Sequence, residues 1–78
     1  MKVNFEHTDT FGGEANYSWV NRGTIELHDN YSDLAIVRAV KKELVMTGVK
    51  CDREEYFETI VLRPRRICQI IFITFGEN

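Results

Sequence analysis

The chain contains few of the residues on which motif-based assignment of function usually depends. Its 78 residues include two cysteines, two histidines and one proline. Cys51 and Cys68 are too few for a disulfide scaffold, so in a reducing compartment we expect free thiols. Together with His7 and His28 they form no C-x2-C or H-x3-H pair. We therefore expect no bound metal, and a site assembled from distant strands is the alternative.

The sequence also lacks a strong charge of either sign. Ten Lys and Arg residues stand against twelve Asp and Glu residues, which gives a formal net charge of −2. General nucleic-acid binders usually carry a basic excess, and a mimic of DNA would carry a marked acidic one. The composition argues against both classes.

Long apolar runs are missing as well. The first residues have no apolar segment typical of a secretory signal. No run approaches the ~20 apolar residues that span a bilayer. We therefore expect a cytoplasmic protein.

No set of residues forms a recognisable catalytic site. Ser18 and Ser32 lack the context of a nucleophile elbow or a triad. We expect Glu54 and Glu55 to be solvated surface residues rather than an acid–base pair. Gly12-Gly13 is followed by neither a helix start nor Lys-Ser/Thr, so it is not a phosphate loop. We expect a protein that is not an enzyme and needs no cofactor.

The chain does contain one strongly apolar segment, residues 67–75, and it predicts a central β-strand. Cys68, Ile70 and Phe72 share one face. Ile71, Ile73 and Phe75 share the other, so both faces require cover.

The remaining elements follow from periodicity and capping. Alternation predicts strands over 2–8 and 16–28. Residues 56–62 form a third predicted strand, although neither of its faces is uniformly apolar. A helix is expected between Ser32, a good N-cap, and Gly48, a good residue to follow the C-cap. Its apolar stripe contains Ile36, Val37, Val40 and Leu44. Residues 49–55 and 63–66 are expected to be surface connections, and 76–78 a tail.

Residues 16–28 leave two possibilities open. They form one long strand that bends at Gly23, or two strands separated by a turn at 21–23. Tyr17, Trp19 and Ile25 keep the same inward parity across the interruption, which favours one strand.

Together these elements predict a single α+β domain spanning 1–78. The order is β-β-α-β-β, a two-layer sandwich with a mostly antiparallel four-stranded sheet and one helix on one face. Numbered along the chain, the strand order 2-1-4-3 places the final strand inside and parallel to the first.

The sharpest charge feature is the turn that contains Arg63, Arg65 and Arg66 around Pro64. Three guanidinium groups held close together can bind phosphate or a partner's carboxylates in a bidentate manner. The alternative is a solvated tip that keeps a hairpin soluble.

The second apolar face of the final strand is the other candidate site, because one helix covers only one face. Either Ile70 with Phe72, or Ile71 with Ile73 and Phe75, would remain open, with Val20, Phe57 and Val61 as possible additions. A surface of this kind usually binds a partner, here a second copy of the chain or a host protein. The alternative is that the loops at 9–15 and 49–55 cover it.

Two stretches of sequence resemble small accessory proteins encoded by tailed phages and prophages. They are TFGGEANYSWV, residues 10–20, and IIFITF, residues 70–75. Anti-CRISPR proteins are the best-known members of this class. The resemblance implies a small non-enzymatic cytoplasmic protein that binds host machinery, blocks a nucleic-acid channel or locks a conformational change.

These observations lead to one functional hypothesis with two alternatives. The hypothesis is a phage-encoded inhibitor of a CRISPR-type host nuclease complex, active as a monomer or as a homodimer. Its predicted contact residues are Trp19, Arg22, Glu54, Glu55, Arg63, Arg65 and Arg66. The alternatives are a small nucleic-acid-binding module that uses the arginine turn with sheet aromatics, and a structural or assembly subunit of a phage particle.

Overall fold

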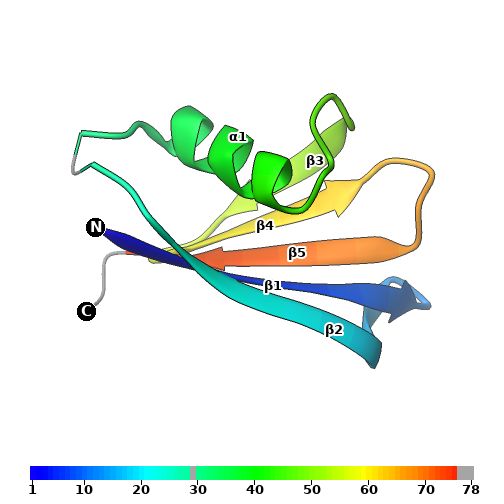
Figure 1. Ribbon diagram of the computed structural model, residues 1–78. Coiled ribbons are helices and arrows are strands. Elements are labelled where there is room, and N and C mark those ends of the chain that lie inside the picture. The colour runs from blue at the N-terminus through cyan, green and yellow to red at the C-terminus, as the bar shows by residue number, and fades with distance from the viewer. Residues whose placement is uncertain (29, 76–78) are drawn as a thin grey trace.

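The computed structural model describes residues 1–28 and 30–75. In these residues the chain forms one antiparallel sheet with one helix across it (Figure 1). The small α+β class predicted from the sequence is confirmed. Asp29 and the expected tail at 76–78 lie outside the described residues. The elements in chain order are β1 (Lys2–Phe11), β2 (Glu14–Glu26), α1 (Asp33–Glu43), β3 (Cys51–Glu55), β4 (Thr59–Pro64) and β5 (Gln69–Thr74).

The sheet has five strands, whereas the sequence predicted four. The additional strand is β3, which had been assigned to a charged surface connection. β3 lies at the edge of the sheet, pairs only with β4, and has four exposed residues out of five. Because neither of its faces is well covered, β3 carries no hydrophobic alternation from which a strand can be predicted.

The additional strand also changes the direction of the last one. The sheet order is β2-β1-β5-β4-β3, so β5 is central, as its composition predicted. Each antiparallel strand reverses the direction of the chain, so the additional strand β3 reverses the direction in which the final strand runs. β5 therefore runs antiparallel to β1, with Phe5 opposite Ile73, and the predicted parallel pairing was wrong.

The hydrophobic core lies between α1 and one face of the sheet. Ile36, Val37 and Val40 from the predicted helical stripe are buried, and Leu44 packs beside them. The facing residues come from alternate positions of the strands, as the pleat requires. They are Val3, Phe5, Ile60, Leu62, Ile71 and Ile73, with Met46 from the loop after the helix.

Helix α1 begins where the sequence predicted and ends earlier. The Ser32 hydroxyl accepts a hydrogen bond from the Ala35 N–H at 3.2 Å, which confirms the N-cap. At the other end, the Val45 and Met46 N–H groups donate to the carbonyls of Lys42 and Lys41, the two bonds of a Schellman motif. The chain leaves the helix at Val45 instead of Gly48 because Met46 then enters the core.

Three boundaries near the C-terminus differ from the prediction. Tyr56 lies before β4 and not within it, and its N–H closes a turn onto the Thr59 carbonyl at 2.8 Å. Pro64 is the last residue of β4, opposite Cys51, instead of a turn residue. Cys68 precedes β5 and is exposed, so it is not sheltered within an apolar strand as expected.

β2 is one continuous strand, the favoured alternative, but its inward parity is broken at Tyr17. Tyr17 has a φ of 58°, and the β1–β2 register shifts between Thr8 and Thr10. Its hydroxyl therefore bonds Glu6, on the sheet face opposite α1, which we call the rear face. Gly23 is required because the Phe5 ring lies against it: a Cβ there would be 2.5 Å from Phe5 Cζ.

Candidate functional site

The rear face is largely closed by the chain itself. Ile70 and Val61, on the rear side of β5 and β4, are only 2% and 5% exposed. Arg63 reaches across to the β1–β2 turn, where its Nη1 donates to the Gly13 carbonyl at 2.8 Å. The broad apolar rear surface expected from the sequence is therefore much smaller, because the first hairpin folds towards β4.

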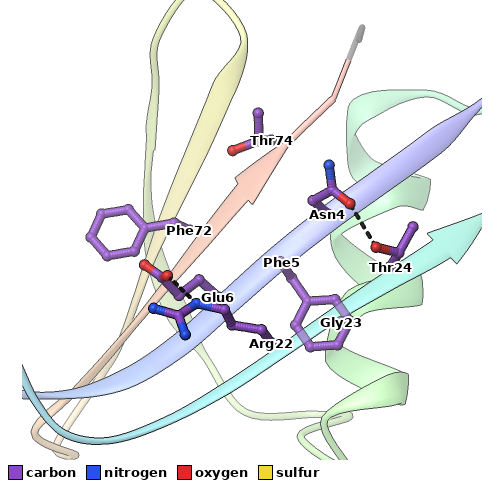
Figure 2. Close-up of a pocket in the computed structure, with 8 residues that line it drawn as sticks. All are labelled: Asn4, Phe5, Glu6, Arg22, Gly23, Thr24, Phe72 and Thr74. Atoms are coloured by element: carbon purple, nitrogen blue, oxygen red, sulfur yellow. Dashed lines mark hydrogen bonds and ion pairs between the residues drawn. The ribbon is translucent and has the colours of Figure 1, made fainter. Parts of the chain in front are cut away.

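A shallow groove of approximately 530 Å³ remains on the rear face, lined by polar side chains together with Phe5 and Phe72 (Figure 2). Cross-strand pairing arranges its side chains in rows. Asn4 lies opposite Thr24 on β2 and opposite Thr74 on β5, and the Thr24 hydroxyl donates to Asn4 Oδ1 at 2.7 Å. Phe72, which is half-buried, lines the groove with an apolar ring.

Glu6 is the centre of the second row. Its carboxylate accepts hydrogen bonds from the Tyr17 hydroxyl and from Arg22 Nε, each at 2.7 Å. These two bonds, that from Tyr17 first, lower the pKa of Glu6 below its ordinary value, and the same carboxylate raises the pKa of Tyr17. Arg22 is thus neutralised within the chain, and the groove carries no net charge with which to attract phosphate.

The predicted arginine turn is also largely paired. Arg65 directs Nε and Nη2 at Asp52 Oδ1, both at 3.0 Å. Arg63 Nε lies 3.5 Å from Glu54 Oε2. Arg66, with a φ of 67°, has no ion-pair partner among residues 1–28 and 30–75. The structure therefore does not bring the three guanidinium groups together as one open anion site.

The two predicted acidic residues lie on the exposed edge strand β3. Glu54 accepts a hydrogen bond from the Tyr56 hydroxyl at 2.9 Å, which raises the pKa of Tyr56. Glu55 pairs with Arg53 at 3.0 Å. Solvent-exposed pairs of this kind contribute little to stability, so these side chains can exchange partners at small cost.

Trp19 is neither fully in the core nor free of contacts. Its ring meets the His7 ring edge-on at a centroid distance of 4.9 Å. His7 in turn bonds the Gln69 side chain through Nε2 at 2.8 Å. Trp19, His7 and Gln69 thus form a row across β2, β1 and β5, on the helix side of the sheet but outside the core that α1 covers.

This row belongs to an exposed end of the sheet that includes residues the sequence did not single out. The Thr10 N–H donates to the Cys68 carbonyl at 3.0 Å, which ties the first hairpin to the β4–β5 turn. Phe11 follows Thr10 and Ile67 precedes Cys68 in the chain, just beyond the last β1–β5 pair, Asp9 with Gln69. Phe11 is 81% exposed and Ile67 is also exposed.

We call Phe11, Trp19, Arg66 and Ile67 the hairpin-end surface. Figure 1 shows this end of β1, β2 and β5 projecting beyond α1. The sequence contained one usable signal: an aromatic residue stands directly before a Gly-Gly turn, where a side chain has nothing to cover it.

A network around Asp9 fixes the shape of the first hairpin. The Asp9 carboxylate accepts bonds from the Ser18 N–H at 2.9 Å, the Ser18 hydroxyl at 2.6 Å and the Asn16 amide at 3.0 Å. These donors, the Ser18 side chain first, hold the pKa of Asp9 well below its ordinary value. The bulge that redirects Tyr17 is therefore stabilised by a charged acceptor.

The two cysteines, the potential metal ligands and the length of the helix also bear on function. Cys51 and Cys68 are not bonded to each other, and burial raises the pKa of the Cys51 thiol. Among the described residues, no three His, Cys, Asp or Glu side chains gather closely enough for a metal ion. No helix in the described part of the chain is long and apolar enough to span a membrane.

Comparison of the chain with protein-family models, with curated proteins and with solved structures gave no match. The resemblance to phage accessory proteins therefore stays a prediction.

Proposed function

We propose that this chain is a non-enzymatic module that binds another protein through the hairpin-end surface. The observation that carries the proposal is the pair Phe11 and Ile67, two exposed apolar residues that adjoin the two ends of the Thr10–Cys68 hydrogen bond. Trp19 and Arg66 lie at the same end, and Trp and Arg are the residue types most enriched at the centre of interfaces.

The backbone at this surface supports the proposal. Tyr17, two residues before Trp19 in β2, and Arg66, in the β4–β5 turn, have φ values of 58° and 67°. Non-glycine residues in this region are strained and persist only when their surroundings hold them. The surface is therefore presented in one preformed shape, which reduces the entropy lost on binding.

Within this class we propose the narrower role that the sequence resemblance implies. The partner is a host-defence nuclease complex of the CRISPR type in the cytoplasm, blocked sterically or held in one conformation. Arg63, Arg65 and Arg66, at the same end of the sheet, form the polar rim of this surface, whereas the predicted contact residues Arg22, Glu54 and Glu55 lie further from it along the sheet. Binding then requires neither a cofactor nor a membrane.

Substitution of the exposed apolar pair tests the proposal. F11S/I67S removes apolar contact area without opening the core, whereas F57S changes a 92% exposed phenylalanine in the β3–β4 turn and serves as the matched control. Wild type and F57S should capture the same protein from cells and inhibit it, and F11S/I67S should lose both properties. Equal capture by all three variants would contradict the assignment.

One observation favours a second candidate function. Arg38, Lys41 and Lys42 line a groove of approximately 420 Å³ beside α1, and none of them pairs with an acidic group in the described part of the chain. Any nucleic-acid binding would use this groove rather than the arginine turn. A steep loss of RNA or DNA affinity with added salt, abolished in K41E/K42E, would support this candidate.

A further inference from the structure

Strand β2 forms one edge of the sheet, and its hydrogen-bonding groups alternate between β1 and solvent. The Leu27 N–H donates to the Met1 carbonyl, and the Met1 ammonium donates to the Leu27 carbonyl. Because the N–H and C=O of one residue point the same way and alternate along a strand, Ile25 and Gly23 also face β1. Thr24 and its even-numbered neighbours therefore direct their backbone groups outward, where no described strand pairs with them.

The second half of this edge lacks three of the features that usually prevent edge pairing. Proteins protect sheet edges with prolines, bulges, very short strands or charged side chains. Of these, only the charged side chains, Arg22 and Glu26, are present here. β2 is disturbed only near Tyr17, and its register with β1 is continuous from Val20 to Glu26 without a proline. The opposite edge, β3, is only five residues long.

The charges on this edge are complementary to themselves. Arg22, Thr24 and Glu26 have the same parity and lie on the rear face. Their register partners on β1 are Glu6, Asn4 and Lys2. The side chains of Arg22 and Glu26 are 63% and 72% exposed. Arg22 uses Nε for Glu6, and no described residue accepts a bond from its two Nη groups.

From this arrangement we infer that two copies of the chain associate through antiparallel β2–β2 pairing about a two-fold axis at Thr24. The axis places Arg22 of each copy opposite Glu26 of the other, so two cross-strand ion pairs form. The three outward-facing pairs, Thr24 with Thr24 and Arg22 with Glu26 twice, each exchange two backbone hydrogen bonds. On the helix side, Ile25 comes opposite Gly23, which has no side chain to oppose it.

Charge selects this register among those that the backbone allows. An axis at Arg22 would set two arginines opposite each other, and an axis at Glu26 would do the same with two glutamates; both are unfavourable. An axis at Gly23 sets Arg22 opposite Thr24, and an axis at Ile25 sets it opposite His28, so neither gives Arg22 a carboxylate partner. Only the axis at Thr24 gives two opposite-charge pairs, and it joins the two sheets into one continuous ten-stranded sheet.

Charge reversal tests the inference with the full chain. The variants E26R and R22E each place like charges across the axis, so each alone should be monomeric. An equimolar mixture restores Arg–Glu pairs at both positions and should form heterodimers. E58R makes the same charge change at an exposed turn residue and should dimerise like wild type. Sedimentation equilibrium over micromolar to millimolar concentrations measures wild type, the three variants and the mixture.

Each outcome decides the inference. A wild-type dimer that weakens at least tenfold in E26R, with recovery in the mixture, supports it. A wild-type monomer throughout the concentration range, a dimer indifferent to E26R, or open-ended assemblies from β2–β3 pairing overturn it. If R22E fails to fold because it loses the Glu6 bond, T24P supplies the second variant. T24P removes an outward N–H at the axis, together with the Thr24 hydroxyl bond to Asn4, and should also prevent dimerisation.

Discussion

Val45 is a residue in a backbone conformation that suits it poorly. It has a φ of 58° and a 90% exposed side chain at the position after the helix C-cap, where glycine is usual. β-Branched residues are especially disfavoured in this left-handed region. The strain is tolerated because the turn delivers Met46 to the core.

V45G should therefore stabilise the fold. Removing the left-handed strain should raise the free energy of unfolding by about 1 kcal/mol, since the left-handed conformation costs an L-residue ~1–2 kcal/mol and the added chain entropy of glycine offsets part of this. Urea denaturation measures the change. K42G places glycine inside the same helix and should lower stability by about 1 kcal/mol. A V45G protein less stable than wild type would contradict the C-cap assignment.

Gly23 is constrained by space rather than by backbone conformation. G23A would place a Cβ at 2.5 Å from Phe5 Cζ, so the ring must move within a packed core. We expect a loss of about 2 kcal/mol, in the range for overpacking. The double variant G23A/F5L should recover part of the loss. Equal costs for G23A in the wild-type and F5L backgrounds would show that the ring contact is not the cause.

At the scale of elements, the first hairpin depends on a charged carboxylate. The folded state lowers the pKa of Asp9 from its ordinary 3.8, so the ionised form is favoured on folding. The contribution of Asp9 to the free energy of unfolding is therefore fully present above its ordinary pKa and decreases as the pH falls below it. The hairpin should therefore be a source of acid sensitivity in this chain.

D9N tests this pH dependence. The variant should be less stable than wild type near neutral pH, and the difference should shrink below about pH 4, where wild type loses the same charge. E14Q, an exposed change in the same hairpin, should leave the pH profile of wild type unaltered. A difference between D9N and wild type that is constant with pH would exclude the carboxylate as the cause. Urea midpoints across the acid range provide the measurement.

The elements that bury one clear face could be predicted from the sequence, and the others could not. The stripe from Ile36 to Val40 and the doubly apolar β5 gave the helix and the central strand. β3 escaped prediction because a strand exposed on both faces has no periodicity. Tyr17 escaped because its orientation depends on the Asp9 network, which joins residues of two different strands.

The same limit applies to the candidate site. Trp19 and Arg66 could be selected as large or charged side chains in sequence. Their grouping with Phe11 and Ile67 depends on the antiparallel β1–β5 register, which became antiparallel only through the unpredicted β3. The arginine turn looked open in sequence because its partners Asp52 and Glu54 lie on that same strand.

At the scale of the whole molecule, the chain covers its own most apolar strand. α1 shelters one face of β5, and the first hairpin and Arg63 close much of the other. Exposed apolar residues lie at both ends of the sheet, with Phe11 and Ile67 at one and Tyr56 and Phe57 at the other, and Leu34 and Val45 are exposed on and after α1. Since β2 at the side is available for self-pairing, the hairpin end can remain accessible in a dimer.

Site-specific photo-cross-linking in cells that express the chain tests the binding surface most directly. A photoreactive phenylalanine analogue replaces Phe11 in one variant and Phe57 in another, and both substitutions preserve an exposed aromatic ring. The account predicts one discrete covalent adduct with another protein from position 11 and none from position 57. Adducts from position 57 alone, or none from position 11, would contradict it.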